Sequence, residues 1–333
     1  MGLGFMGSTH LKAYKRIPGM ELVAVVSNDE YQLTGDLSGI QGNIGGPGEK
    51  LDFSGLHKYT DAMEAVHDPE VEAVDICLPT NMHAPVAIEA LRHGKHVLVE
   101  KPMATDGETA DRIAAEAEKQ GKTLMVGQVL RFWPAYVALR ELLQQGGLGA
   151  VHSALFRRRC AARAGQSWIT NRALSGGGVY DLLIHDVDMC LHLFGAPEAV
   201  SAWGYEDMQH GIDVITAQLH YSGIPSVTVT GGWHHPRAYP FSMEYTVVAD
   251  GGTVEFSSAG RPPALYDKSG EKRDLPLTDV DSYASEIRYF LDCASTGRTP
   301  VLCPPRESAA AVKLMNLIVN ARNRKGEKLA CEL

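Results

Sequence analysis

Two groups of residues in this sequence are of types that do chemistry: a lysine after an apolar run, and an aspartate–histidine pair. Lys101 directly follows Glu100 and the strand-like run 96–99. This place suits a catalytic lysine, because doubly wound folds put their ligands at the carboxyl ends of strands. Asp181 and His185 are four residues apart, so a helix would present them on one face. Taken singly, such a lysine is more often a surface charge and such a pair is ordinarily a surface pair.

A glycine-rich turn at the start predicts a dinucleotide site. Gly2-Leu3-Gly4-Phe5-Met6-Gly7 fits the G-x-G-x-x-G pattern and opens a predicted helix. Its glycines let backbone N–H groups approach a pyrophosphate beside the positive end of the helix. A strand about 20 residues further on and a repeated βα pattern favour cofactor binding over a plain glycine turn.

The same pattern should follow a buried strand of about five apolar residues, whereas the sequence begins inside the pattern. Losing a central strand would leave neighbouring sheet edges unpaired. We therefore expect the first strand to be missing and the biological start to lie upstream of Met1.

The choice between NAD and NADP depends on the end of the second strand. NAD-binding proteins usually place Asp or Glu there for the ribose hydroxyls, but this sequence has Ser27 or Asn28. Residues 27–34 contain no Lys or Arg to hold a 2′-phosphate, and Asp29 and Glu30 would repel one. The pattern favours NAD over NADP.

Alternating apolar runs and helical patterns predict a doubly wound parallel sheet in a first domain, residues 1–127. Consecutive strands followed by two helices predict an α+β domain with a largely antiparallel sheet over residues 128–333. The stretch 30–58 is too rich in glycine for a helix and is predicted as a long loop. Such a loop is either functional or mobile, or it is a surface insertion without a role. The expected strands are 21–26, 73–78, 96–100, 123–126, 151–159, 199–205, 214–221, 226–233, 243–249 and 252–256; the expected helices are 10–17, 61–66, 83–93, 107–119, 282–295 and 306–324.

Composition excludes several classes of protein. A net charge of -9 gives no broad positive field for nucleic acid, and the run 157–159 of three arginines is predicted as mostly a solvated strand. Six scattered cysteines without a C-x-x-C pair suggest neither a zinc site nor a disulfide framework, which fits a reducing compartment. No apolar run approaches the roughly 20 residues of a membrane span, and no signal peptide is recognisable. We expect a cytoplasmic protein without membrane contact.

In combination, the motifs resemble the glucose-fructose oxidoreductase / inositol dehydrogenase family (Gfo/Idh/MocA oxidoreductases) over nearly the whole chain. The motifs are the glycine pattern, Pro79-Thr80-Asn81-Met82-His83, Glu100-Lys101-Pro102, and Gly176-Gly177-Gly178-Val179-Tyr180-Asp181-Leu182-Leu183-Ile184-His185-Asp186-Val187-Asp188. The resemblance implies a Rossmann domain followed by a domain whose large open sheet commonly makes the interface of a homodimer or homotetramer.

The resemblance also implies roles for the reactive residues. Lys101 would contact the reacting hydroxyl of a sugar, polyol or inositol and help position the nicotinamide. His185 would be the general acid/base and Asp181 its partner, which suits a group that titrates near neutral pH beside a carboxylate. Two alternatives stay open: relatives that cleave glycosidic bonds through transient oxidation by NAD, and relatives that sense the dinucleotide without catalysis.

The remaining candidate residues follow strands or lie in the second domain. Pro79, Thr80, Asn81 and His83 line the expected cofactor pocket, or Thr80 or Asn81 simply caps a helix. Trp233, His234 and His235 could join Trp168 in a sugar-facing wall, or these residues pack in the sheet or at an oligomer interface. His185, Asp188 and His192 lack a second cluster, so no metal is expected. The expected cofactor contacts are Gly2, Gly4, Phe5, Met6, Gly7, Ser27, Asn28, Leu78, Pro79, Thr80, Asn81, His83, Glu100, Lys101 and Gln128, and the expected substrate contacts are Arg131, Trp133 and Trp168.

Overall fold

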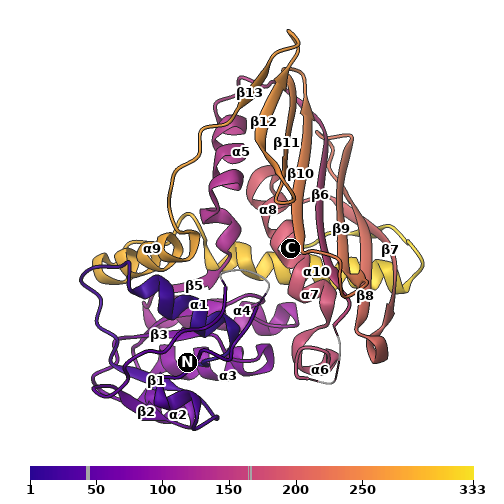
Figure 1. Ribbon diagram of the computed structural model, residues 1–333. Helices are drawn as coiled ribbons and strands as arrows, with labels where there is room; N and C mark the ends of the chain where they lie inside the picture. The colour runs from indigo at the N-terminus through magenta and orange to yellow at the C-terminus, as the bar shows by residue number, and fades with distance from the viewer. Residues whose placement is uncertain (43–45, 164, 166) are drawn as a thin grey trace. The chain divides into compact units, whose positions relative to one another are not determined.

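The chain folds into two compact units in the computed structural model, which describes residues 1–42, 46–163, 165 and 167–333 (Figure 1). Met1–Val129 and Val280–Ala309 form the first unit, and Leu130–Asp279 and Ala310–Leu333 form the second. The sequence placed the whole of 128–333 in one domain. Residues 280–309 instead join the first unit, because helix α9 (Ser282–Thr296) packs on helix α1 (Phe5–Tyr14).

The first unit contains parallel strands in two groups. Strands β3, β4 and β5 form a three-stranded parallel sheet, and β1 pairs with β2, a strand that the sequence did not predict. Residues 1 and 2 hydrogen-bond to both groups: Gly2 N donates to Val26 O (2.9 Å) and Cys77 N donates to Met1 O (2.8 Å). The elements are β1 (Ala24–Val26), β2 (His57–Tyr59), α2 (Ala62–His67), β3 (Ala73–Ile76), α3 (Thr80–Arg92), β4 (His96–Glu100), α4 (Gly107–Gln120) and β5 (Leu124–Gly127).

Helix boundaries in this unit follow local capping chemistry. The Asp106 carboxylate accepts a hydrogen bond from Thr109 N (2.8 Å) at the start of α4, and Gly121 ends the helix in the left-handed region. Helix α3 begins differently: Pro79 is its N-cap residue and makes no side-chain cap bond. The alternative in which Thr80 or Asn81 caps this helix is therefore wrong.

The glycine-rich stretch after β1 is part of the core. Leu33, in the short 3-10 helix η1 (Gln32–Thr34), together with Leu37 and Phe53, packs with Leu3, Leu11 and Val25. An isolated bridge joins Asp36 to Lys50. The prediction of a plain loop over 30–58 is thus incomplete, because its apolar residues are spaced irregularly and showed no helix or strand period. Asn43, Ile44 and Gly45 lie outside the described residues.

The second unit is a nine-stranded sheet with helices on one face (Figure 1). Its strand order is β13-β12-β11-β10-β6-β9-β8-β7-β14, antiparallel except between β6 and β9. The mixed α/β fold class is confirmed, although α5 and the last three strands were not predicted. The elements are η2 (Val129–Phe132), α5 (Pro134–Gln144), β6 (Val151–Ala161), α6 (Arg172–Ser175), α7 (Gly178–Leu182), α8 (Ile184–Phe194), β7 (Ala199–Asp207), η3 (Met208–His210), β8 (Ile212–His220), β9 (Ser226–His235), β10 (Ser242–Ala249), β11 (Gly252–Ser257), β12 (Arg261–Asp267), β13 (Lys272–Asp274), α10 (Pro305–Asn323) and β14 (Leu329–Ala330).

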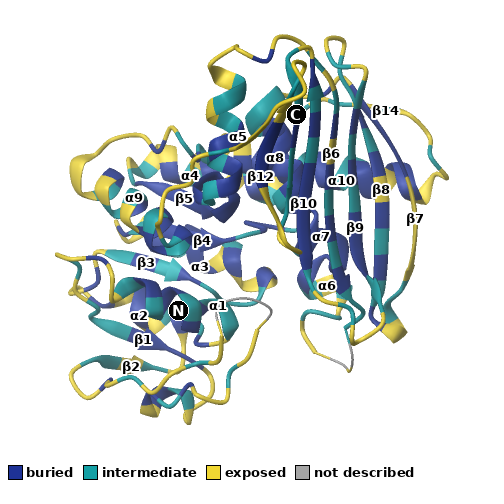
Figure 2. Cartoon of the chain, turned by 45° about the horizontal axis from the view of Figure 1, so that its top comes forward, coloured by how far each residue is buried: buried dark blue, intermediate teal, exposed yellow. Residues whose placement is uncertain are grey.

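Burial alternates along the central strands of this sheet (Figure 2). In β6, Phe156 and Arg158 are buried beneath the helices, whereas Leu155 and Arg157 face the other side. The prediction of a mostly solvated arginine run is wrong for Arg158, whose guanidinium binds buried Asp186 (Nε to Oδ2, 2.8 Å; Nη2 to Oδ1, 3.1 Å). A buried arginine needs a paired carboxylate, and sequence alternation alone does not reveal one.

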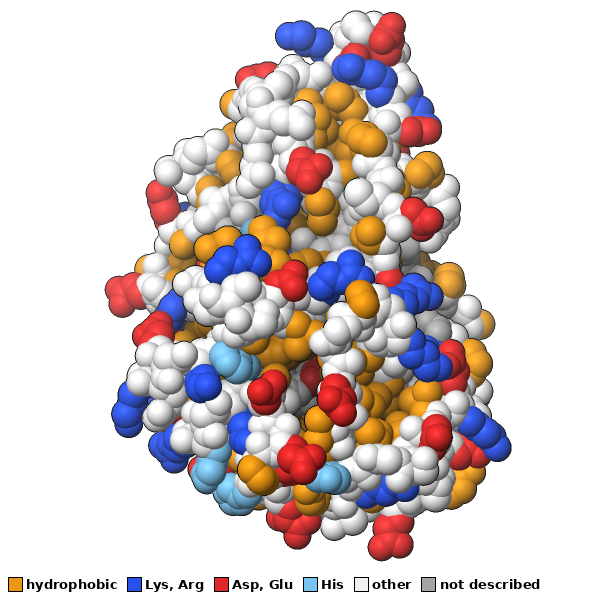
Figure 3. All heavy atoms as spheres, turned by 90° about the vertical axis from the view of Figure 1, so that its left-hand side faces the viewer, with side chains coloured by type: hydrophobic (Ala, Val, Ile, Leu, Met, Phe, Trp, Pro, Cys, Tyr) orange, Lys and Arg blue, Asp and Glu red, His pale blue; other side chains and the backbone are white. Residues whose placement is uncertain are grey.

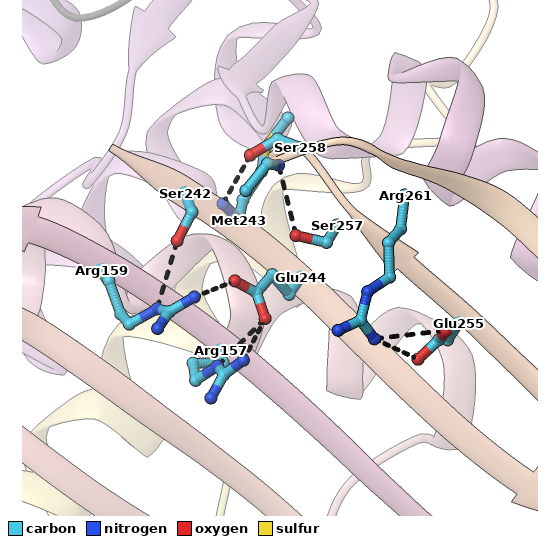
Figure 4. A network of polar contacts seen from close by, with 10 residues as sticks. Arg157, Arg159, Ser242, Met243, Glu244, Glu255, Ser257, Ser258 and Arg261 are labelled. Atoms are coloured by element: carbon cyan, nitrogen blue, oxygen red, sulfur yellow. Dashed lines mark hydrogen bonds and ion pairs between the residues drawn. The ribbon is translucent and has the colours of Figure 1, made fainter. Parts of the chain in front are cut away.

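The other two arginines of this run lie on the opposite face of the sheet. Arg157 and Arg159 both bind the carboxylate of Glu244 on the neighbouring strand β10, and Arg159 Nε also donates to Ser242 Oγ (3.2 Å) (Figure 4). The register explains this arrangement, because Glu244 pairs directly with Arg157. The run is therefore split between a buried ion pair and a surface network.

The distribution of surface charge and the state of the cysteines can be read from the structure. Acidic and basic side chains are interspersed on the face shown in Figure 3, and all six cysteines are free thiols. Among the residues that the structure describes, no helix combines the length and apolar character that crossing a bilayer requires.

The packing of the glycine-rich stretch predicts a large effect from a small truncation. Leu37→Ala should lower the free energy of unfolding of the first unit by about 2–5 kcal/mol, because it empties a buried site. Urea denaturation followed by fluorescence measures this loss. Val301→Ala is the control, because Val301 is 71% exposed in the same unit, and it should stay within about 0.5 kcal/mol of wild type. Equal effects of the two substitutions would contradict the placement of Leu37 in the core.

Candidate functional site

The glycine turn before α1 has the geometry of a phosphate cradle. Gly2 has a φ of +84°, and a Cβ at Gly7 would lie 1.9 Å from Gly2 O, so both positions require glycine. A Cβ at Gly4 would meet nothing within 4 Å, which leaves open space beside the helix start. Gly4 is the N-cap residue and supplies no capping side chain, and the first turn has no acidic residue. Unblocked N–H groups at a positive helix end fit a pyrophosphate.

A buried histidine joins two of the predicted cofactor segments. The two ring nitrogens of His83 lie 2.8 Å from Leu78 O and 2.9 Å from Pro102 O. Burial lowers the pKa of His83, and the two carbonyl contacts oppose that shift. This contact ties the end of the β3 segment to the turn that carries Lys101. The structure thereby brings Leu78, His83 and Lys101 together at one edge of the parallel sheet, where Rossmann folds place their ligands.

Glu100 and His10 form an ionic cluster beneath this edge. His10 Nδ1 lies 2.7 Å from Asp75 Oδ2, and His10 Nε2 lies 3.2 Å from Glu100 Oε1. Burial disfavours the charged form of His10, but Asp75 and Cys77 outweigh burial and raise its pKa well above 6.5. Burial likewise opposes ionisation of Asp75, but His10 lowers the pKa of that carboxyl to about 2. Sequence reasoning missed His10 and Asp75, because only the fold brings residues 65 positions apart into contact.

The two candidates for a ribose contact at the end of β1 differ in exposure. Ser27 is buried, its Oγ donates to Gln32 Oε1 (2.7 Å), and it accepts from Asp29 N (3.1 Å). Asn28 is exposed. Of the two, Asn28 is the residue with a side chain open to a ligand.

In the second unit, the expected catalytic helix consists of two short helices, α7 and α8, joined at Leu183. Leu183 keeps helical dihedral angles (φ -80°, ψ -14°). Its N donates to Val179 O and its O accepts from Val187 N, both at 2.9 Å. Asp181 and His185 are therefore four residues apart on a nearly continuous helical path, and both are partly exposed. Arg163 Nη2 lies 3.8 Å from Asp181 Oδ2.

The start of α7 is held by a buried carboxylate and a tryptophan. Asp213 Oδ2 accepts from Val179 N (3.0 Å), and Asp213 Oδ1 binds Arg322 Nη1 (2.5 Å). A Cβ at Gly178 would lie 2.5 Å from the Trp233 ring. Trp233 is fully buried under this turn, so of its two expected roles the burial fits packing in the sheet and contradicts a place in a sugar-facing wall. Trp168 is 41% exposed.

Helix α8 is fixed by two buried arginine–aspartate pairs. Arg131 binds Asp188 in bidentate fashion, with Nε at 2.8 Å and Nη2 at 2.7 Å, and Arg158 binds Asp186. Arg131 is only 2% exposed, so the structure does not support its predicted contact with a substrate. The two arginine–aspartate pairs instead hold in place the helix that carries His185, which directly precedes Asp186. Two other candidates near Arg131 differ in burial: Gln128, in the first unit, is 1% exposed, and Trp133 is half-buried at the start of α5.

Comparison with known proteins identifies the family. Residues 1–128 match the model of an oxidoreductase family with an NAD-binding Rossmann fold, and residues 136–255 match the GFO/IDH/MocA C-terminal domain. The chain belongs to the Gfo/Idh/MocA family of oxidoreductases, and the resemblance seen in its motifs is confirmed.

Curated relatives align over most of the chain. It is 30% identical to myo-inositol 2-dehydrogenase of Thermotoga maritima over 317 residues, covering 91% of this chain and 89% of the relative. It is 31% identical to 4-carboxy-2-hydroxymuconate-6-semialdehyde dehydrogenase of Sphingobium sp. over 309 residues, covering 90% of each. Levoglucosan dehydrogenase, solved with NADH and levoglucosan, has the same fold, with a TM-score of 0.84, 17% identity and coverage of 100% of this chain and 99% of that one.

The ion pair between Asp75 and buried His10 predicts a pH-dependent stability. Its carboxyl pKa falls from 3.8 to about 2 on folding, so its contribution is present above about pH 4 and is lost as the pH falls towards 2. Full loss corresponds to about 2 kcal/mol. Asp75→Asn should therefore destabilise the protein at pH 6, and the difference from wild type should shrink at pH 3.

Urea denaturation of both proteins at the two pH values measures the effect. Glu72→Gln removes an exposed carboxylate next to β3 and is the control, with no pH-dependent difference expected. A difference between Asp75→Asn and wild type that stays constant from pH 6 to pH 3 would contradict the ion pair.

Proposed function

We propose that this protein is an NAD-dependent dehydrogenase or reductase that acts on a CH–OH group of a sugar, polyol or inositol. One observation carries the proposal: the same chain holds a glycine turn shaped for a pyrophosphate, Lys101 at the ligand edge of the parallel sheet, and a partly exposed Asp181–His185 pair. The names of its relatives, among them an NAD-linked scyllo-inositol and a myo-inositol 2-dehydrogenase, support the substrate class.

Each protein group has a separate part in the reaction. Oxidation of an alcohol to a ketone removes a proton from oxygen and a hydride from carbon, and NAD held at the glycine turn would supply the hydride acceptor. His185 takes the hydroxyl proton, which is the usual part of an imidazole in general acid/base catalysis. Asp181, one turn earlier, orients the imidazole and stabilises its charged form. The Lys101 ammonium group stabilises the negative charge that develops on the oxygen.

Residues around the glycine turn would hold the cofactor. The pyrophosphate fits the open space at Gly4, beside Phe5 and Met6 at the start of α1. Asn28 would face the ribose, and acidic Asp29 and Glu30 disfavour the 2′-phosphate of NADP. The segment 78–83 and Gln128 would complete the pocket.

Two other functions are compatible with membership of this family. A glycosidase that oxidises its sugar transiently would retain NAD and release sugar without net NADH. A dinucleotide sensor would bind NAD without turning over any polyol. The presence of Lys101, Asp181 and His185 together favours the dehydrogenase.

His185→Gln tests the assignment of the general acid/base. With NAD and a panel of myo-inositol, scyllo-inositol and glucose, kcat/KM should fall by about 10²–10⁴. The Kd for NADH, measured by fluorescence, should change less than about threefold, because the dinucleotide site lies in the first unit. His192→Gln, on the same helix α8, is the control and should retain wild-type turnover. Unchanged turnover in His185→Gln would refute the role.

The open face of the nine-stranded sheet supports a second proposal, that a second copy of this chain covers it. In the described residues of the second unit, helices lie on the other face of the sheet (Figure 1). The open face carries exposed Leu155 and Tyr266 beside the hydrogen-bonded pair Thr216 and Thr230. The same face carries the paired charges of Arg157, Arg159 and Glu244. A face that combines apolar side chains with paired polar ones suits a symmetric dimer, in which the same surface meets itself. Either a dimer or a tetramer would cover this face. The cytoplasmic location expected from the sequence stays a prediction.

Leu155→Glu should weaken that association, because it buries a charge in the proposed interface. Light scattering after size exclusion should show a shift towards the 36.1 kDa monomer. Leu277→Glu changes an exposed leucine outside the sheet and should leave the assembly intact. An unaltered oligomer in Leu155→Glu, or a monomeric wild type, would contradict the proposal.

A further inference from the structure

A histidine buried behind the glycine turn links the two halves of the candidate site in the first unit. His10 lies on α1, three residues after Gly7, and is 1% exposed. One ring nitrogen faces the carboxylate of Asp75 at 2.7 Å and the other faces that of Glu100 at 3.2 Å. Helix α1 begins at the dinucleotide turn, and Glu100 immediately precedes Lys101.

The groups around this imidazole come from four elements. Strand β3 and the residue after it supply Asp75 and Cys77, strand β4 supplies Glu100, and helix α1 itself supplies Tyr14. The Tyr14 hydroxyl donates to Asp75. Helix α9 places the ring of Tyr283 against His10, with centroids 5.9 Å apart. The buried carboxylate of Glu100 and the partly buried carboxylate of Asp75 therefore flank one imidazole. A carboxylate withdrawn from water needs a cationic or hydrogen-bonded partner.

A metal ion is a poorer explanation for this cluster, although His10, Asp75 and Cys77 lie close enough to hold one. The distance of 2.7 Å between His10 Nδ1 and Asp75 Oδ2 is that of a charge-assisted hydrogen bond. Direct contact at this distance, with Glu100 facing the other ring nitrogen at 3.2 Å, fits an imidazolium between two carboxylates better than a shared metal ion.

Glu100 transmits this contact to the lysine. Its second carboxylate oxygen, Oε2, accepts from the backbone N of Lys101 at 3.1 Å. A Cβ at Gly127 would lie 2.9 Å from Glu100 Oε1, so the neighbouring strand β5 confines the carboxylate. The path from α1 through His10 and Glu100 to the Lys101 backbone consists of short contacts between buried groups.

We propose that His10 is a positioning residue: by bridging Asp75 and Glu100, it holds the dinucleotide turn and the Lys101 backbone in the one relative geometry that hydride transfer requires. The proposal rests on the proposed role of Lys101. It differs from a purely structural role, in which loss of His10 would lower stability and leave chemistry at Lys101 unchanged.

The experiment compares His10→Gln, Glu100→Gln and the double variant with wild type. His96→Gln is the matched control, because His96 lies at the opposite end of β4, where its ring accepts from Thr123 N. With NAD and the best substrate among myo-inositol, scyllo-inositol and glucose, kcat should fall about 10–100-fold in each single variant. The kcat of the double variant should be no lower than that of the poorer single variant, because the two substitutions interrupt the same chain of contacts. The kcat of His96→Gln should stay within about twofold of the wild-type value, because this substitution leaves the contacts of His10 and Glu100 intact.

A second measurement does not need the substrate. Saturating NADH should protect Lys101 from acetic anhydride in wild type and in His96→Gln, as read by peptide mass spectrometry. In His10→Gln, still saturated with NADH, the protection should fall at least several-fold. Nitrogen-15 NMR of histidine-labelled protein should show both nitrogens of His10 protonated at pH 7.

The outcomes separate the two proposals. If bound NADH does not protect Lys101 in wild type, the proposed role of Lys101 fails. If protection is equal in wild type and His10→Gln, or if kcat is unchanged while the melting temperature falls, His10 is a structural residue and the inference is overturned. A neutral His10 at pH 7 would also overturn it.

Discussion

A buried charge needs a partner, and in this protein the partners fix the candidate catalytic elements. Removing water from a carboxylate costs several kcal/mol unless a cation or hydrogen-bond donors replace it. Helix α1 after the glycine turn, the start of α7 and the body of α8 each carry or contact such a charge pair. The pairs are His10–Asp75, Arg322–Asp213, Arg131–Asp188 and Arg158–Asp186. Each tolerates little displacement, because a shifted partner leaves an uncompensated buried charge.

Glycines complete this arrangement by letting backbone segments approach closely. Gly7 allows the turn to fold onto Gly2, and Gly178 allows the start of α7 to lie on Trp233. In both places the glycine removes the one atom that would clash, and a buried charge then holds the resulting geometry. Partly exposed Lys101, Asp181 and His185 therefore project from rigid supports, as preorganised catalysis requires.

The sequence predicted the residues that contact ligands better than those that support them. The glycine pattern, the lysine after β4 and the Asp181–His185 spacing are local signals, and the family that they indicate is confirmed. The supports are not local: 109 residues separate Asp213 from Arg322, and 57 separate Arg131 from Asp188. A single sequence shows an arginine and an aspartate without showing that they meet, which is why Arg131 was predicted to contact substrate. The apolar residues of the glycine-rich stretch were missed because their spacing follows no regular element.

Hydride transfer from carbon to NAD is the central claim, and isotope transfer tests it most directly. The protein would be incubated with NAD and with inositols and glucose that carry deuterium on every carbon, and the dinucleotide would be analysed by mass spectrometry. The account predicts net NADH that carries one deuterium. Retention of all deuterium by the sugar products without net NADH, or no deuterated NADH from any of these polyols, would contradict it.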